Sequence, residues 1–93
     1  MAHVSIRLPS VLRQLDSTYP CEVEVEGETA RDALRALTTR HPTLGRHLFD
    51  ERDALREHVL CVHNGRQLRE SSLDAATLGE GDELAIMQAV SGG

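Results

Sequence analysis

The segment His58-Val59-Leu60-Cys61-Val62-His63-Asn64-Gly65-Arg66-Gln67-Leu68 decides the fold. An apolar run is followed by Asn64-Gly65 and then by a second, shorter run that ends on Leu68. Asn-Gly readily takes the positive φ angles of a type I′ turn, whose twist matches that of two antiparallel strands. Residues 58–68 therefore predict a β-hairpin.

Three more strands are expected on either side of this hairpin. Polar and apolar residues alternate over 3–8 and again over 21–26, which is the period of a half-buried strand. The second of these strands places Glu22, Glu24 and Glu26 on one face. After a turn at 79–82 (GEGD), residues 83–90 form the last and most apolar strand.

One main helix is expected between the second strand and the hairpin. Thr29 and Asp32 have the spacing of a capping box, and a stripe of small and aliphatic residues follows over 30–37. The helix should end before Pro42, because the residue preceding a proline disfavours helical geometry. We expect 11–20 to be an ordered connection, 43–49 to pack under the sheet, and 50–57 (DERDALRE) to be an exposed excursion.

This order of elements indicates an α+β protein in which a mixed sheet wraps around one main helix. Nothing in the 93 residues marks a linker or an internal repeat. We therefore expect one folded domain over 1–90 and a flexible tail over 91–93.

The charge of the chain argues against nucleic-acid and membrane partners. The net charge is −5, all ten basic residues are arginine, and there is no tryptophan. A basic stripe is what dominates nucleic-acid affinity, and none is present. No apolar run is long enough to span a membrane or to act as a signal peptide, so a cytoplasmic protein is expected.

The candidate chemical groups are few. Cys61 and His63 share one side of a strand and could bind a metal, but a structural zinc needs four ligands and no other spacing supplies them. A buried strand cysteine is the favoured interpretation of Cys61. The glutamates of 22–28 are either a docking face for a basic partner or simply the solvated side of a strand. We expect no catalytic residue, no metal and no bound cofactor, and hence no enzyme.

Three segments together resemble the ubiquitin-like sulfur carriers of the MoaD/ThiS family: LCVHNGRQL (60–68), LGEGDELAIM (78–87) and the final AVSGG (89–93). The resemblance extends over essentially the whole chain and implies a ubiquitin-like β-grasp fold. The excursion at 50–57 and the opening VSIRLPSVLR make the chain most similar to the longer, CysO-type carriers.

The resemblance also implies a mechanism in which this chain is a co-substrate. An E1-like adenylating and sulfurtransferase enzyme uses ATP to activate the carboxyl group of Gly93, and sulfur then converts it to a thiocarboxylate. A sulfur-accepting synthase consumes that sulfur, and chain length favours cysteine biosynthesis as the pathway. The resemblance implies that Ser91 and Gly92 thread the tail into the partner enzymes. Glycine suits this role because it carries no Cβ to obstruct a narrow channel. The free carrier is expected to be a monomer.

A docking surface for the activating enzyme is expected beside the tail. We assign it to Met87 and Ala89 of the last strand together with Val59 and Cys61 of the hairpin, as an exposed apolar face. The alternative is that loops of the chain itself cover Met87. Other functions also remain open: a sulfur carrier for molybdopterin, thiamin or a thiosugar, a modifier conjugated to target lysines, and a passive β-grasp interaction module.

Overall fold

The computed structural model describes residues 2–10 and 20–88. Its elements are the strands β1 (Ala2–Arg7), β2 (Glu22–Gly27), β3 (Val59–His63), β4 (Arg66–Leu68) and β5 (Glu83–Gln88), the helices α2 (Ala30–Arg40) and α3 (Pro42–Leu48), and the short 3₁₀ helix η1 (Glu70–Ser72). The strands and the main helix follow the order that the sequence predicts.

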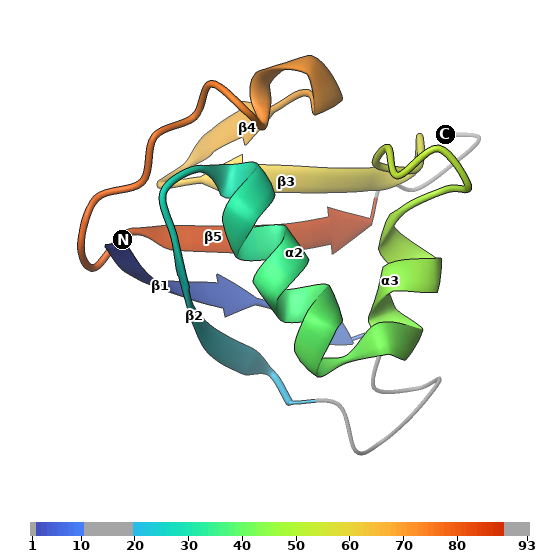
Figure 1. Ribbon diagram of the computed structural model, residues 1–93, viewed down its shortest axis with the longest axis horizontal. Helices are drawn as coiled ribbons and strands as arrows, with labels where there is room; N and C mark the ends of the chain where they lie inside the picture. Colours follow the sequence, from blue (N-terminus) through green and yellow to red (C-terminus); the bar gives the residue numbers. More distant parts are fainter. Residues whose placement is uncertain (1, 11–19, 89–93) are drawn as a thin grey trace.

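The five strands form one mixed sheet in the order β2-β1-β5-β3-β4 (Figure 1). β1 and β5 run parallel, and the other neighbouring pairs are antiparallel. The first and last strands of the chain are therefore neighbours, and β5 lies in the middle of the sheet. This position matters for function because β5 leads directly into residues 89–93.

The predicted hairpin is confirmed. Asn64 and Gly65 both have positive φ angles, 48° and 88°, and His63 pairs with Arg66 across the turn. The Asn64 side chain accepts a hydrogen bond of 2.9 Å from the backbone N–H of Glu83. The hairpin turn is thus attached to the beginning of β5.

Helix α2 begins and ends where the sequence predicts. The hydroxyl of Thr29 accepts a hydrogen bond of 3.2 Å from the backbone N–H of Asp32, and the helix ends at Arg40, two residues before Pro42. The apolar stripe is fully covered: Ala30, Ala33, Leu34 and Leu37. The segment after Pro42 is itself a short helix, α3, whose Leu44 and Leu48 complete the same layer.

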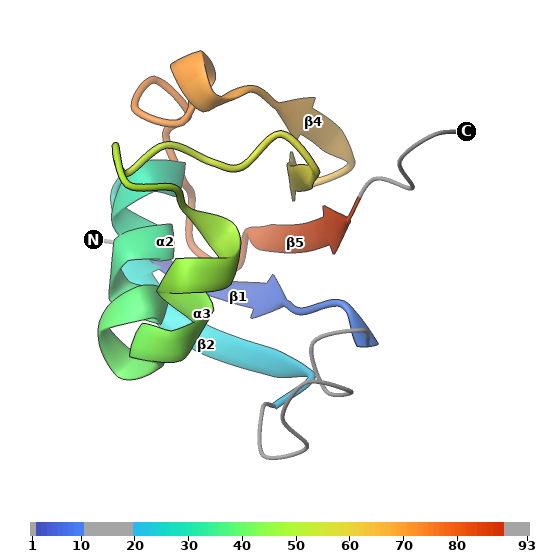
Figure 2. The same cartoon turned by 90° about the vertical axis from the view of Figure 1, so that its right-hand side faces the viewer.

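Both α-helices pack on the same face of the sheet (Figures 1 and 2). Between these helices and the sheet lies a core made almost entirely of aliphatic side chains, including Ile6, Leu34, Leu37, Leu84 and Ile86. Among the described residues, no helix covers the opposite face of the sheet (Figure 2).

One buried charge was not expected from the sequence. Arg31 lies within the apolar stripe of α2 but is only 8% exposed. Its guanidinium donates to the carboxylates of Glu70 and Asp74 and to the backbone carbonyl of Asp53. Glu70 in turn accepts a hydrogen bond of 2.7 Å from the backbone N–H of Leu55. This network fastens two loops to the beginning of the helix.

The network corrects our expectation for residues 50–57. The segment is not uniformly exposed, because Ala54, Leu55 and Arg56 are half-buried and Leu55 packs against the core. The Asp50 carboxylate accepts from the N–H groups of Arg52 and Ala54 and closes a tight turn. A run of charges can therefore be part of an ordered loop when a side chain from elsewhere in the chain, here the half-buried Glu70, accepts a hydrogen bond from one of its backbone N–H groups.

Two of the predicted regions lie outside the described residues. They are the connection at 11–20, described only at Pro20, and the tail at 91–93 together with the end of the last strand at 89–90. Within the described part of the chain, no helix is long and apolar enough to cross a membrane.

Candidate functional site

The tail of the chain begins at the end of a central strand. Gln88 is the last residue of β5 and pairs with Val59, the first residue of β3. Five residues, 89–93, follow it, and a fully extended chain of that length spans at most about 17 Å. A partner that binds Gly93 must therefore come close to the end of the sheet at which β5 ends.

Met87 lies beside this point on the uncovered face. Its side chain is 51% exposed, and it is the one large hydrophobic residue of the described chain that is this exposed. Met87 is paired with Leu60 across β5 and β3, and Ala85 is paired with Val62. All three neighbours are half-buried. We call Leu60, Val62, Ala85 and Met87 the apolar strip.

The prediction that Val59 and Cys61 belong to this exposed face is wrong. Val59 is 4% exposed and Cys61 is fully buried. Directly paired residues of antiparallel strands point to the same side of a sheet, and Cys61 is paired with Ile86, a core residue. Burial raises the pKa of the Cys61 thiol to about 11. Cys61 is accordingly a small core side chain, which confirms the interpretation of it as a buried strand cysteine.

A signal for the correct register was present in the sequence. The two-residue turn at Asn64-Gly65 fixes the pairing of Cys61 with Leu68. Leu68 is flanked by Gln67 and Arg69, so Leu68 must face the core, and its partner Cys61 must face the core as well. β3 alone is ambiguous because both of its faces are apolar.

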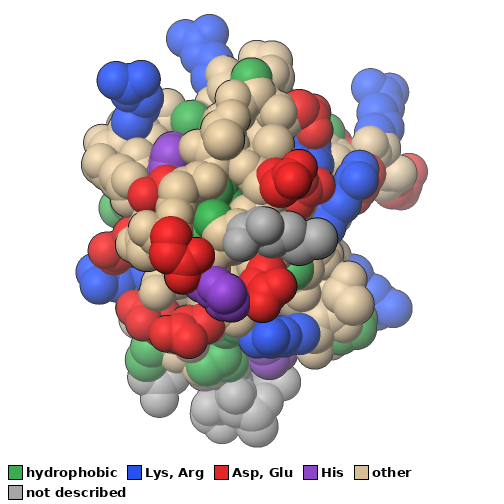
Figure 3. All heavy atoms as spheres, turned by 60° about the vertical axis from the view of Figure 1, so that its left-hand side comes forward, with side chains coloured by type: hydrophobic (Ala, Val, Ile, Leu, Met, Phe, Trp, Pro, Cys, Tyr) green, Lys and Arg blue, Asp and Glu red, His purple; other side chains and the backbone are tan. Residues whose placement is uncertain are grey.

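The other half of the uncovered face is acidic. Glu22, Glu24 and Glu26 of β2 are all exposed, as the alternation predicted. His3 lies between two carboxylates, with its ring nitrogens 2.8 Å from Glu26 and 3.1 Å from Glu80. The hydrogen bond that the His3 ring donates to Glu80 is the main cause of the raised pKa of His3. Figure 3 shows Asp and Glu side chains gathered around a histidine on one side of the molecule.

His63, the possible metal ligand, is bound by a carboxylate instead. Its Nε2 lies 2.8 Å from Oδ2 of Asp82, and both side chains are about four-fifths buried, at 18% and 21% exposure. Asp82 also accepts from the backbone N–H of Gly79, and these hydrogen bonds lower its pKa to about 2. In the described ranges 2–10 and 20–88, no group of three or more His, Cys, Asp or Glu could hold a metal ion.

The remaining predicted site residues, Ala89, Ser91, Gly92 and Gly93, lie outside the described residues. The structure brings Met87 of the predicted set to the uncovered face and moves Val59 and Cys61 into the core. Sequence reasoning missed Leu60 and Val62, which take their places.

Comparison with known proteins agrees with this arrangement. The ThiS family profile matches residues 6–93. Small archaeal modifier protein 1 of Haloferax volcanii is 37% identical over 87 residues, which cover 88% of this chain and 91% of that protein.

Two solved structures extend the comparison to the fold. The solution structure of small archaeal modifier protein 1 from Methanosarcina acetivorans superposes with a TM-score of 0.81 at 30% identity, covering 100% of this chain and 98% of the other. A chain of the Amycolatopsis orientalis BexX/CysO complex gives 0.80 at 28% identity, covering 97% and 99%. The fold is therefore the ubiquitin-like β-grasp that the sequence predicted.

Proposed function

The chain belongs to the ThiS family of ubiquitin-like sulfur carriers and modifiers, and on that premise we propose that it carries sulfur as a thiocarboxylate on Gly93. The protein is then a co-substrate of its partner enzymes and performs no catalysis itself. The observation that carries this proposal is that the family match runs through Gly93.

The chemistry follows from the poor reactivity of a carboxylate, whose negative charge repels nucleophiles. The activating partner transfers AMP from ATP to the Gly93 carboxylate and releases pyrophosphate. Sulfide then attacks the carbonyl carbon and expels AMP, which leaves the thiocarboxylate. A persulfide as the attacking group would give an acyl disulfide, which a thiol must then cleave by disulfide exchange to release the same thiocarboxylate. ATP belongs to the partner, and this chain contributes only the carboxyl group and its approach.

The sequence of the tail suits that approach. Glycine at 92 and 93 carries no Cβ, so no side chain crowds the carbonyl under attack, and the backbone can take either sign of φ. Ordering such residues in a partner's channel costs about 1–2 kcal/mol each in conformational entropy. Contacts made elsewhere on the carrier must offset this cost.

We assign those contacts to the apolar strip. It lies on the face that α2 and α3 leave uncovered, and one of its two strands is β5, which leads into the tail. Met87 is its most exposed member. A flexible thioether can adapt to more than one partner surface, and the carrier must meet both an activating enzyme and a sulfur-accepting synthase. The likeness to a chain of the BexX/CysO complex supports a carrier that works through partner proteins.

As the sulfur acceptor we propose an intermediate of cysteine biosynthesis, on the ground of the chain's length and its likeness to CysO-type chains. Carriers for molybdopterin, thiamin and thiosugars would use the same tail. Incubating the loaded protein separately with an activated serine and with the molybdopterin, thiamin and thiosugar precursors, each with its own synthase, distinguishes these pathways, because only one acceptor should discharge the thiocarboxylate.

The decisive experiment is intact-mass spectrometry after incubation with ATP, sulfide and the cognate activating enzyme. We expect a mass gain that corresponds to sulfur replacing one oxygen, located on Gly93 by fragmentation. A variant that lacks Gly93 should fold normally and acquire no sulfur. If the complete chain gains no mass while the enzyme loads a known substrate, the proposal is wrong.

The identity of 37% with small archaeal modifier protein 1 favours one alternative, conjugation to the lysines of target proteins. Activation of Gly93 is common to both functions, so the product distinguishes them. A modifier yields adducts of higher mass on a denaturing gel, whereas a carrier yields a small sulfur-containing product. This chain has no lysine, so its own side chains cannot accept a second copy through an isopeptide bond.

A further inference from the structure

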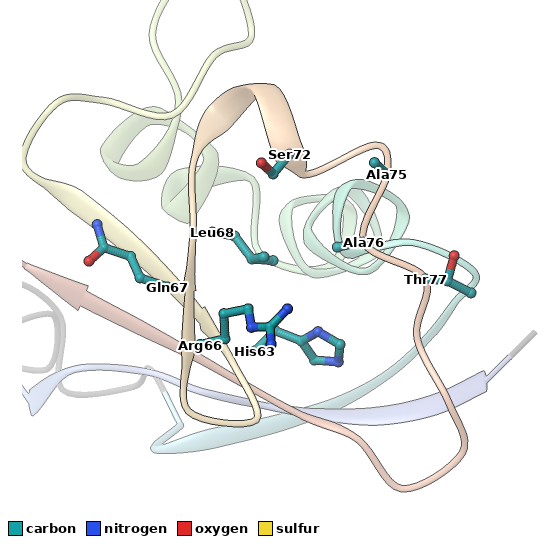
Figure 4. A pocket seen from close by; sticks show the side chains of 8 residues that line it. All are labelled: His63, Arg66, Gln67, Leu68, Ser72, Ala75, Ala76 and Thr77. Carbon is teal, nitrogen blue, oxygen red and sulfur yellow. The ribbon is translucent and has the colours of Figure 1, made fainter.

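A groove lies at the far end of the sheet from the tail. It runs between the hairpin formed by β3 and β4 and the connection 72–77, and its volume is about 390 Å³. We call it the hairpin groove (Figure 4). His63, on its wall, is paired with Leu84 near the beginning of β5, whereas Gln88 at the end of β5 is paired with Val59. The groove is therefore about 13 Å along β3 from the tail.

The hairpin groove contains an arginine that no described carboxylate pairs with. The chain carries a net charge of −5, yet no carboxylate lines the groove, and its ionisable lining residues are His63 and Arg66. Arg66 is exposed and takes part in none of the ion pairs within 2–10 and 20–88. Its guanidinium is thus available to an oxyanion, which it can bind through two parallel hydrogen bonds.

Neutral donors surround the same space. Figure 4 shows the side chains of Arg66 and His63 on the hairpin side and those of Ser72 and Thr77 on the connection opposite. Each of the two hydroxyls can donate a hydrogen bond. Leu68 contributes an apolar surface between the two sides. One cation, hydroxyl donors and an apolar wall suit a small organic molecule that carries a phosphate or carboxylate group.

Both walls of the groove are held in place without a ligand. The carbonyls of Leu73 and Ala76 accept hydrogen bonds of 3.1 and 3.0 Å from the first backbone N–H groups of α2. On the other side, Asp82 fixes the ring of His63 at 2.8 Å. A preformed site loses little conformational entropy when a ligand binds.

We propose that the hairpin groove binds a small organic oxyanion, with Arg66 as the anchoring cation and Ser72 and Thr77 as additional donors. The site is separate from Gly93 and from the apolar strip. It gives the carrier a second binding activity that requires neither ATP hydrolysis nor an activating enzyme. The proposal and the proposed sulfur chemistry can therefore fail independently of each other.

The test is a titration of the ¹⁵N-labelled full chain, followed by two-dimensional NMR, with inorganic phosphate, AMP and benzoate as separate probes. We expect amide shifts concentrated at Arg66, Gln67, Ser72 and Thr77, with a Kd of about 1 mM for the best probe. Tighter binding of AMP than of phosphate would identify an organic phosphate, and tighter binding of benzoate would identify a carboxylate.

Two arginine variants decide whether the groove is the site. Arg66→Ala should weaken binding about tenfold or more, since it removes a charged hydrogen-bond donor. Arg69→Ala removes the same charge from an exposed position that does not line the groove, and it should leave the affinity nearly unchanged. Equal weakening by both variants, or no localised shift with any probe, would overturn the proposal.

Discussion

Met87 of β5 lies directly opposite Leu60 of β3 on the face of the sheet that no described helix covers. The pair joins a half-exposed thioether to a half-buried leucine one residue before the end of the last strand. An apolar surface beside a tail of five residues is well placed to hold the carrier while the tail reaches into an active site.

Met87→Asp should therefore impair activation of Gly93. A charge within the apolar strip must be desolvated against an apolar partner surface, so the KM for the carrier should rise about tenfold or more in ATP–pyrophosphate exchange. Stability should change little, because the side chain is exposed. Thr43→Asp, a substitution at another exposed position, on α3, is the control and should leave KM unchanged.

Cys61→Ser tests the corrected orientation of β3. The side chain is fully buried and belongs to the core. Replacing its thiol by a more polar hydroxyl should therefore destabilise the protein by about 1–3 kcal/mol in urea unfolding. The KM for the activating enzyme should not change at a temperature where the variant is folded. A raised KM with normal stability would instead return Cys61 to the docking surface.

Arg31→Met should reveal how strongly the buried network holds the two loops. The substitution keeps most of the side-chain volume but leaves Glu70 and the carbonyl of Asp53 without their donor, at a cost of about 2–3 kcal/mol in the free energy of unfolding. Arg35→Met, one turn later, breaks only an exposed ion pair of 3.6 Å with Asp53. It should cost less than about 1 kcal/mol.

Gly27→Ala should destabilise the contact between β2 and α2. A Cβ at this position would lie 2.8 Å from the backbone nitrogen of Ala33, and a backbone atom cannot rotate away, so we expect a loss of about 1–3 kcal/mol. At Gly79 the nearest atom to a new Cβ is 3.6 Å away. Gly79→Ala should therefore be nearly neutral. Thermal unfolding of both variants beside the unmodified protein measures the two effects.

Acid should weaken the fold partly through Asp82. Folding lowers the pKa of this carboxyl to about 2, mainly through the hydrogen bond from Gly79, so its ionised form favours the folded state. That stabilisation is complete above the unfolded pKa of about 4 and is lost as the pH falls to about 2. Asp82→Asn should flatten the pH dependence of stability in this interval, whereas Glu51→Gln, on the exposed turn, should not.

The elements of the fold could be read from local signals. Asn64-Gly65 predicted the hairpin, Thr29 and Pro42 marked the limits of the main helix, and the alternation over 21–26 separated exposed glutamates from buried valines. These signals act within a few residues, where backbone sterics and the period of side-chain burial decide the outcome. α3 was not assigned as a helix, because its seven residues are too few to show a helical period.

For the candidate site, the sequence decided less than it did for the elements of the fold. The sequence by itself determined the family and directed attention to Met87 and to the glycines at 92 and 93. It did not determine which face of β3 is buried, because Leu60 and Val62 are as apolar as Val59 and Cys61. Only the pairing of β3 with β5 decided that Leu60 joins Met87 and that Cys61 joins Ile86 in the core. The same holds for Arg31, whose partners at Glu70 and Asp74 are about forty residues away and meet it only in the folded chain. Local sequence therefore decides whether a segment can form a helix, a strand or a turn. Long-range packing decides which of its side chains meet solvent, because a shift of one residue in strand register would move every side chain to the other face of the sheet.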